Sequence, residues 1–265
     1  MPEGDTVFRT ARLLERALAG GLLVHAELRH PRLVGVDLAG HTVLGVRSVG
    51  KHLFVRFSAG LSLHNHLRLD GGWQVYRPGQ RWRRPSHQAR VVLRTAEREA
   101  VGFLLHDLAV LATADEPELV GHLGPDLLDP EWSPGHAAEA VRRFTAVPDR
   151  EVGLVLLDQT VLAGVGNLYK TEVCFLLGVS PWTPVSEVDA ARAVALSRTL
   201  LLRNAWRPEQ STTGEVARGL RHWVYDRAGR PCRRCGTPVR AGVQDSGTRQ
   251  RTTWFCPRCQ PGPRP

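Results

Sequence analysis

The first residues of the chain are of types that can do covalent chemistry together. Pro2 follows the initiator Met1, and Glu3 comes next. If Met1 is removed, the nitrogen of Pro2 is a free secondary amine, and an amine can attack an electrophilic sugar carbon or carbonyl to form an imine-type intermediate. A neighbouring carboxylate can move protons in such a reaction. The alternative is that Pro2 is an ordinary second residue and that Glu3 is an acid at the start of a helix.

The last 34 residues contain a second group with chemical meaning, two Cys-x2-Cys pairs separated by 20 residues. Four thiolates at this spacing are typical of a tetrahedral, structural zinc site with no open coordination position. Two disulfides are the alternative, which an intracellular chain without a leader disfavours. We therefore predict one structural Zn²⁺ held by Cys232, Cys235, Cys256 and Cys259, and we interpret Cys174 as a core residue.

The charge of the chain indicates a polyanionic partner. The net charge is +9, and from Val216 to the end eleven arginines face only two acids. Such a local excess of positive charge favours a nucleic acid as the binding partner. The alternatives are a solvated basic tail and the arginine bias of a GC-rich genome. Only Lys51 and Lys170 are lysines among 35 basic residues. A lysine kept at position 51 suggests a need for an amine that can exchange its proton, which guanidinium does not do.

The elements that must position these residues change in type along the chain. Helical spacing of apolar residues predicts a first helix to about Ala19, capped by Asp5 or Thr6, so that Pro2 and Glu3 lie just ahead of its positive end. Short apolar runs separated by turn residues then predict antiparallel strands in a sandwich or flattened barrel. The predicted strands are 33–38, 41–46, 52–57, 61–66, 73–76, 89–93 and 101–105.

The second half of the sequence is predominantly helical. Prolines and acids predict a linker over 114–136. Helices are then expected over 151–159, over 168–177 after tight glycine turns, and from Ser186 to about Asn204 with Asp189 in capping-box position. A β-hairpin is expected between the cysteine pairs, with its turn at Asp245-Ser246-Gly247, and we interpret Arg249 and Arg251 on it as candidate phosphate ligands.

Length and composition exclude several classes of protein. A chain of 265 residues with 42% apolar residues is long enough for two domains and is not generally disordered. No run of about 18 apolar residues predicts a membrane span, and no apolar segment typical of a signal peptide follows the acidic start. We therefore expect a cytoplasmic protein.

Several motifs in a fixed order resemble the formamidopyrimidine-DNA glycosylase and endonuclease VIII family of base-excision repair enzymes. The similarity covers nearly the whole chain, and the Gly4-Asp5-Thr6-Val7 start is more similar to the endonuclease VIII branch. The motifs are Pro2-Glu3-Gly4-Asp5, Gly50-Lys51-His52, His66 to Gly71, Leu123 to Asp126, Asp158-Gln159 with Gly164 to Asn167, and Arg251 with Cys256 to Gln260.

The resemblance implies an α+β fold with an N-terminal helix plus β-sandwich and a C-terminal helix–two-turn–helix domain with a zinc finger, with DNA between the two domains. We expect a catalytic β-sandwich domain over 1–113, a linker over 114–136, a helix–two-turn–helix domain over 137–225 and a zinc finger over 226–265. The expected partner is damaged double-stranded DNA. A monomer with no small-molecule cofactor is expected.

The resemblance also implies roles for single residues. Pro2 would attack C1′ of the damaged nucleotide, and Glu3 would act as general acid and base. Lys51 would assist early proton transfer, and Arg251 would hold phosphate during a second elimination. Asn167 would bind phosphate through its amide.

Base excision requires the nucleotide to leave the stack, and an apolar wedge commonly fills the gap. Leu69 matches the position of such a wedge in the family, and the alternative is that Leu69 is a core residue of the β-sandwich. His66 is a candidate phosphate contact. His122 stands where endonuclease VIII often has arginine, and it is a further candidate DNA contact.

The predicted function is thus a bifunctional DNA glycosylase and strand-nicking lyase acting on oxidised pyrimidines. Action on oxidised purines is the alternative within the class. A damage-binding protein without catalysis is the alternative from another class. We expect the loop Thr212–Arg218 to cover the extruded base.

Overall fold

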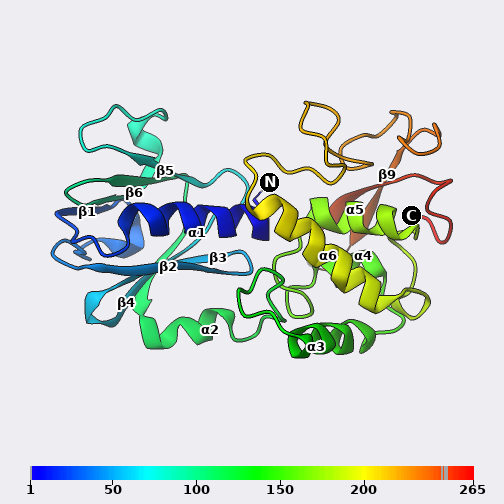
Figure 1. Cartoon of the computed structure of the whole chain (residues 1–265), viewed down its shortest axis with the longest axis horizontal. Coiled ribbons are helices and arrows are strands. Elements are labelled where there is room, and N and C mark those ends of the chain that lie inside the picture. Colours follow the sequence, from blue (N-terminus) through cyan, green and yellow to red (C-terminus); the bar gives the residue numbers. More distant parts are fainter. Residues whose placement is uncertain (1, 246, 248–249) are drawn as a thin grey trace. The chain divides into compact units, whose positions relative to one another are not determined.

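The computed structural model of the 265-residue chain describes residues 2–245, 247 and 250–265. The chain divides into two compact units, Met1–His122 and Leu123–Pro265 (Figure 1). The boundary between the units falls inside the predicted linker over 114–136. None of the helices in the described part of the chain is both long and apolar enough to cross a membrane.

Helix α1 (Gly4–Leu18) opens the first unit. Its apolar face, which includes Val7, Ala11, Leu14 and Leu18, is buried in the main core. The predicted cap is wrong, because the N-cap residue is Glu3 and no side chain caps the helix. The backbone carbonyl of Glu3 instead accepts bonds from the first amides of α1. Helix α1 therefore begins one residue earlier than the predicted cap and directly after Glu3.

Two four-stranded antiparallel sheets follow α1 in the first unit, which confirms the predicted sandwich. Helix α1 contacts strands of both sheets, and the apolar faces of both sheets meet in one core. One sheet has the order β1 (His25–Leu28), β6 (Ala89–Arg94), β7 (Glu99–Phe103), β5 (Gly72–Tyr76). The other has the order β2 (Val43–Val49), β3 (His52–Phe57), β4 (Leu61–His66), β8 (Asp107–Ala112).

The strand predictions fail in two ways. The predicted strand over 33–38 is absent, because a short 3-10 turn (Pro31–Leu33) and a left-handed Gly35 place Leu33 and Leu38 in the core without a ladder. Strands β1 and β8 were not predicted. Strand β1 has only four residues and none of them is fully buried, so it lacks the alternation on which the prediction depends. The other short 3-10 turns are Ser58–Gly60, Ser86–Gln88, Thr113–Asp115 and Val185–Glu187.

The start of the predicted linker is packed structure. Helix α2 (Glu116–Val120) follows β8, and the side chain of Glu116 is almost fully buried. It accepts hydrogen bonds from Arg56 at 2.6 and 2.9 Å and from the Ser62 hydroxyl at 2.7 Å. A buried carboxylate needs such partners to offset its desolvation. The network attaches α2 to strands β3 and β4.

The described residues of the second unit form four α-helices, α3 (Pro134–Thr145), α4 (Val152–Leu157), α5 (Asn167–Leu177) and α6 (Ala190–Ala205). Helix α3 begins inside the predicted linker, where Ser133 provides a capping box with His136. The predicted start of α6 at Ser186 is wrong. Asp189 is itself the N-cap and accepts a bond from the Arg192 amide at 2.9 Å, so the helix begins at Ala190.

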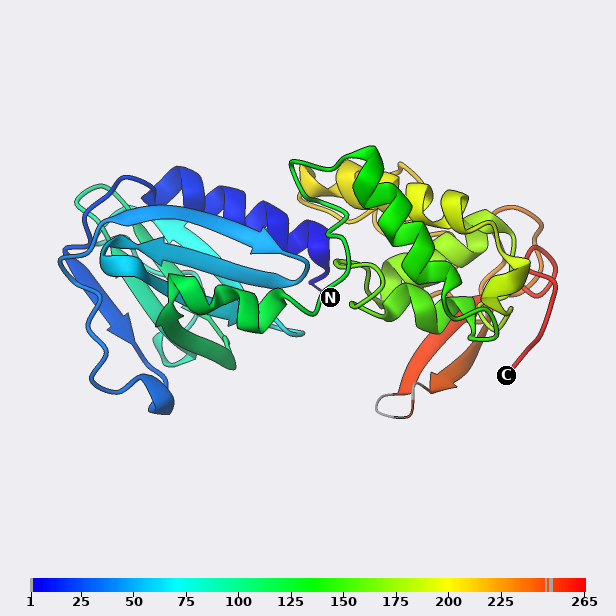
Figure 2. The same cartoon turned by 90° about the horizontal axis from the view of Figure 1, so that it is seen from below.

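The cysteine segment contains the expected hairpin, made of β9 (Arg240–Asp245) and β10 (Gln250–Phe255). The two strands lie side by side as the orange and red arrows of Figure 2. The predicted turn residue Ser246 lies outside the described residues. A small core of Phe175, Val224, Val239, Cys232 and Cys256 joins this segment to α5.

Three histidines are neighbours on β3 and β4. His52 and His66 are directly paired in the sheet, and the His52 Nδ1 to His64 Nε2 distance is 2.9 Å. Burial, with the neighbouring imidazoles adding to it, lowers the pKa of His52 to about 3. Burial, together with Arg68 and Lys51, lowers the pKa of His66 to about 4. Both side chains are therefore neutral near pH 7.

These lowered pKa values predict a loss of stability in mild acid. Between about pH 6.5 and 4 the unfolded chain binds protons at these imidazoles that the folded chain does not bind, so the free energy of unfolding falls as the pH falls. Replacing His52→Gln removes one such group. We therefore expect the free energy of unfolding to depend less steeply on pH in this range, by up to about 1.4 kcal/mol per pH unit, as measured by urea unfolding.

The control is Phe54→Leu, which alters the ring beside His64 without removing a titrating group. It should lower stability by a similar amount at each pH. If His52→Gln shows the same pH dependence as the unsubstituted protein, burial of neutral His52 does not contribute to acid sensitivity.

Candidate functional site

The predicted site residues are distributed over both units. Turns and helix ends carry most of them, and each unit is considered separately. The first unit contains Pro2, Glu3, Lys51, His66, Leu69 and His122, and the second contains Asn167, Arg251 and the four cysteines.

Pro2 and Glu3 lie at the N-terminus of α1. Glu3 is only 1% exposed, whereas Pro2 is half-buried. The amide groups at a helix N-terminus carry partial positive charge, which stabilises a carboxylate and disfavours a protonated amine. The candidate nucleophile Pro2 and the candidate acid–base group Glu3 are thus neighbours directly before a helix. Met1 lies outside the described residues.

Lys51 is held at the tip of the hairpin between β2 and β3. The pair Val49–His52 closes a two-residue turn, and Gly50 has a φ of 57°. A left-handed first turn residue is the requirement of a type II′ hairpin, which glycine meets without strain. The Gly50-Lys51 sequence therefore fixes the position of Lys51 at the end of the β2–β3 hairpin.

Leu69 lies in the turn between β4 and β5 and is 70% exposed. The core leucine of this motif is instead Leu67, at 1% exposure. Gly71 closes the turn, because a Cβ there would be 2.4 Å from the Leu67 carbonyl oxygen. The alternative prediction that Leu69 is a core residue is wrong, and its side chain is available to contact another molecule.

His66 ends β4 next to this turn. Its Nδ1 accepts a hydrogen bond from the Arg68 amide at 3.0 Å. In the neutral imidazole the proton is then on Nε2, which can donate to an acceptor such as a phosphate oxygen. His122 is exposed at the end of the first unit.

The turns before α5 position Asn167. The Gln159 amide donates to the carbonyls of Leu157 and Val165 and accepts from the Gly164 amide at 3.1 Å. Gly124 packs against the same turn, where a Cβ would be 2.4 Å from the Val161 carbonyl oxygen. The two sequence motifs thus form one scaffold for the start of α5.

Asn167 is the first residue of α5 and is 7% exposed. Its Nδ2 donates to the carbonyl of Thr252 at 2.8 Å, and its Oδ1 has no hydrogen-bond partner. The structure therefore brings Asn167 into contact with the strand that carries Arg251. One N–H of the amide remains for an anion.

Arg251 is half-buried on β10, and no ion pair involves its guanidinium among the described residues. A guanidinium on a rigid strand suits a phosphate, which it can bind bidentately. Arg249, the other candidate on this hairpin, lies outside the described residues.

The four predicted cysteines converge. All their sulfur atoms lie within 4.8 Å of one another, and none is in a disulfide. The Sγ–Sγ distances are 3.9 Å for Cys232–Cys259 and 3.5 Å for Cys235–Cys256. Tetrahedral coordination at a metal–sulfur distance of about 2.3 Å puts sulfur atoms about 3.8 Å apart. The cluster can therefore hold a metal ion.

The sequence analysis missed the role of Glu172, a fully buried carboxylate on α5. It accepts hydrogen bonds from the amides of Trp223, Val224 and Tyr225 at 2.7–2.8 Å and from the Thr212 hydroxyl. Both ends of the loop after α6 are thereby attached to one helix. The available signal was an acid on a helix that is apolar on nearly all sides.

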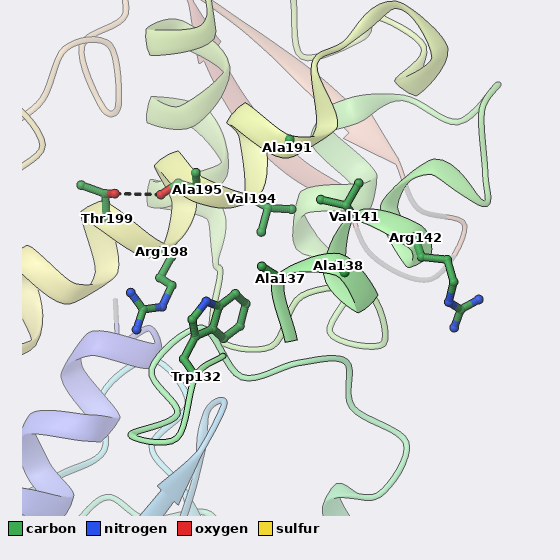
Figure 3. A pocket seen from close by; sticks show the side chains of 10 residues that line it. All are labelled: Trp132, Ala137, Ala138, Val141, Arg142, Ala191, Val194, Ala195, Arg198 and Thr199. Atoms are coloured by element: carbon green, nitrogen blue, oxygen red, sulfur yellow. Dashed lines mark hydrogen bonds between the residues drawn. The ribbon is translucent and has the colours of Figure 1, made fainter. Parts of the chain in front are cut away.

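A groove of about 650 Å³ lies between α3 and α6 (Figure 3). Small and apolar side chains form most of its walls, and Arg198 stacks on Trp132 at one end with 5.2 Å to the ring centroid. Its lining residues include no predicted site residue and no thiol or carboxylate. The groove is therefore separate from the chemistry predicted above.

Two family models match the chain in order. Residues 1–108 match the formamidopyrimidine-DNA glycosylase N-terminal domain, and residues 123–215 match the formamidopyrimidine-DNA glycosylase H2TH domain. The chain is also similar in fold to the Lactococcus lactis Fpg protein solved in complex with abasic-site DNA. That comparison has a TM-score of 0.78 at 21% identity and covers 98% of this chain and 100% of that one.

Two full-length relatives are more similar in sequence. The chain is 54% identical to "Probable endonuclease 8 2" of Streptomyces coelicolor, over 100% of this chain and 96% of the relative. It is 45% identical to "DNA-(apurinic or apyrimidinic site) lyase Nei2" of Mycolicibacterium smegmatis, over 98% of this chain and 99% of the relative. Both family models and these identities show that the chain belongs to the formamidopyrimidine-DNA glycosylase family, among relatives named endonuclease 8.

Proposed function

We propose that this protein is a bifunctional DNA glycosylase and abasic-site lyase of base-excision repair. The observation that carries the proposal is the position of Pro2 and buried Glu3 at the start of α1 in a chain of this family. A protein that only binds DNA has no need of an N-terminal secondary amine. The names of the relatives, endonuclease 8 and DNA-(apurinic or apyrimidinic site) lyase, support the same activity.

The reaction begins at the processed N-terminus. The Pro2 nitrogen forms a bond to C1′ of the damaged nucleotide, and the bond from C1′ to the base breaks with its electron pair leaving on the base. Glu3 accepts the N–H proton of the attached Pro2 nitrogen and protonates the sugar-ring oxygen, which opens the ring and gives an iminium ion between Pro2 and C1′. Loss of a C2′ proton then breaks the 3′ C–O bond, and a second elimination breaks the 5′ C–O bond.

Three further residues assist these steps. Lys51, at the tip of its hairpin, transfers a proton early in the reaction and contacts a phosphate. Arg251 binds phosphate and supports the second elimination, and Asn167 donates its amide hydrogen to a phosphate oxygen. The support for the last two is the direct contact of Asn167 with the strand that carries Arg251. Amide and guanidinium donors complement each other at one anion.

The damaged nucleotide must leave the duplex before C1′ can be attacked. The exposed Leu69 is the proposed wedge that fills the gap, because its turn is fixed while its side chain is outside the core. His66 donates to a phosphate through Nε2, and the exposed His122 is a further DNA contact. The loop Thr212–Arg218, anchored at its base by Glu172, covers the extruded base.

Damaged double-stranded DNA is the proposed partner, and a single copy of the chain acts on it in the cytoplasm without a small-molecule cofactor. The proposed domains are 1–113, 137–225 and 226–265, and the connecting segment 114–136 includes α2 and the start of α3. The proposed metal is one structural Zn²⁺ at the four cysteines. Four thiolates satisfy the preference of zinc for sulfur in a closed tetrahedral site, so the ion stabilises the finger and takes no part in the chemistry.

Trapping with borohydride tests the covalent step. Borohydride reduces the iminium ion, so Met1-processed protein mixed with an abasic-site duplex should give a covalent protein–DNA band. Pro2→Gly, or protein that retains Met1, should give less than about 1% of that band because the secondary amine is lost. The measurement is gel electrophoresis with mass spectrometry of the adduct.

The control is binding to an uncleavable tetrahydrofuran duplex, which Pro2→Gly should retain. Correctly processed protein that binds this duplex but forms no adduct would support the damage-binding alternative and contradict the enzyme.

Removal of the metal tests the proposed zinc finger. Since coordination stabilises the fold of the cysteine segment, a strong chelator should remove one zinc ion per chain and abolish DNA binding. Added zinc should restore binding and added magnesium should not. Cys256→Ser should lose the ion, while Cys174→Ser, a buried cysteine outside the cluster, should keep it. Full activity in metal-free protein would contradict the structural role.

The lesion class needs a separate experiment. We infer oxidised pyrimidines, because the start of the chain and the names of the similar relatives match the endonuclease 8 branch. Single-turnover release of 5-hydroxycytosine and thymine glycol should be at least about tenfold faster than release of 8-oxoguanine from matched duplexes, a difference of roughly 1.4 kcal/mol in barrier. Faster release of the purine would assign the alternative specificity.

A further inference from the structure

Lys170 is the second of the two lysines, and the proposed chemistry does not use it. It lies on α5 three residues after Asn167 and is 0% exposed. A lysine is rarely buried completely, because the loss of hydration of its ammonium must be compensated by hydrogen bonds or charges. Its Nζ donates to Gln244 Oε1 at 3.0 Å and to the hydroxyl of Thr253. Lys170 therefore connects α5 to both strands of the hairpin.

Gln244 is the centre of this contact. Its side chain is 1% exposed, and besides accepting from Lys170 it donates through Nε2 to Glu151 Oε2 at 2.7 Å and to the Pro181 carbonyl at 2.9 Å. The oxygen of the Gln244 amide faces the Lys170 ammonium, and its nitrogen faces the Glu151 carboxylate. Only one of the two orientations of the amide therefore satisfies both neighbours. We call Gln244, Lys170, Glu151 and Thr253 the Gln244 network.

Helix α4 is shaped to admit this amide. A Cβ at Gly153 would be 2.4 Å from Gln244 Oε1 and 2.7 Å from Nε2. Glycine inside a helix costs roughly 0.5–1 kcal/mol relative to alanine, so a packing requirement is the physical reason for it here. The hairpin thus inserts one polar side chain into a fitted position between α4 and α5.

The register connects this network to Arg251. Arg251 is paired with Gln244, and Thr253 is two residues further along β10. Directly paired residues of an antiparallel sheet, and residues two apart on a strand, project from the same face. Gln244, Arg251 and Thr253 therefore share the face that meets α4 and α5, and fixing Gln244 fixes where the backbone of Arg251 lies.

We propose that Lys170 and Gln244 are positioning residues that set the position of the Arg251 guanidinium for phosphate. The inference rests on the proposed phosphate role of Arg251. A two-stranded hairpin has no core of its own, and the metal cluster holds only its base. Near its tip the position of the strands depends on the Gln244 network and on the Asn167–Thr252 hydrogen bond.

A double-mutant cycle on DNA binding tests the proposal. The variants are Lys170→Met, Arg251→Ala and the double variant, and the measurement is the dissociation constant for a tetrahydrofuran duplex as a function of salt. Arg251→Ala should weaken binding by about fivefold or more and reduce the salt slope by about 1, because one phosphate contact is lost. Lys170→Met should have a similar effect, and the double variant should be within about twofold of Arg251→Ala.

Cys174→Ala is the matched control, because Cys174 is equally buried on α5 and lies outside the Gln244 network. Its effect should be small and should add to that of Arg251→Ala. Thr253→Val keeps the shape of the side chain, and serves as the second network variant if Lys170→Met loses its zinc or its fold. It should also show no further loss beyond Arg251→Ala.

The outcomes separate the two claims. If Arg251→Ala binds the duplex as tightly as the unsubstituted protein, Arg251 does not bind phosphate. The proposal that Lys170 and Gln244 position Arg251 for phosphate is then also wrong. In the other case, Arg251→Ala weakens binding, but Lys170→Met or Thr253→Val, folded and loaded with zinc, has no effect on binding. The same conclusion follows if the effect of that variant adds fully to the effect of Arg251→Ala. Either result would keep the phosphate role of Arg251 and contradict the positioning role of Lys170 and Gln244.

Discussion

The second unit depends on one constraint, which is that a two-stranded hairpin cannot stabilise itself. Two strands expose both faces and have no core, so contacts from outside must fix them. Here the cysteine cluster holds the base of the hairpin, and Gln244 inserts between α4 and α5. Asn167 adds a bond to Thr252 at 2.8 Å. Because these contacts are polar and directional, they specify one register and one position, which apolar packing alone would specify less sharply.

The first unit holds its candidate site residues at turns and at the start of a helix. Glu3 is fixed by the start of α1, Lys51 by a two-residue hairpin and Leu69 by a turn that only glycine at position 71 can close. In each case the local backbone is fixed, while the exposure of the side chain differs, from 1% for Glu3 to 70% for Leu69. Binding and catalytic residues on short turns of a packed scaffold combine precision with access to a ligand.

Much of this arrangement was predictable from local patterns, and the failures have physical causes. Strands β3 and β4 match their predictions at both ends because apolar alternation and turn residues coincide there. The prediction of a strand over 33–38 was wrong because Leu33 and Leu38 can be buried without the hydrogen-bond ladder of a β-sheet. Helix α6 begins at Ala190 because Asp189 is its N-cap, which a capping-box pattern alone did not distinguish from an interior position.

The sequence by itself identified the candidate chemical groups: Pro2 and Glu3, four cysteines at metal-binding spacing and a family pattern over nearly the whole chain. Cysteine pairs and catalytic motifs are local in sequence, so spacing is enough to recognise them. Only the tertiary structure decided that Leu69 is exposed, that Glu172 anchors a loop and that Lys170 meets Gln244 across 74 residues of chain. The partners of a buried polar group come from distant segments, and no local pattern encodes which segments meet.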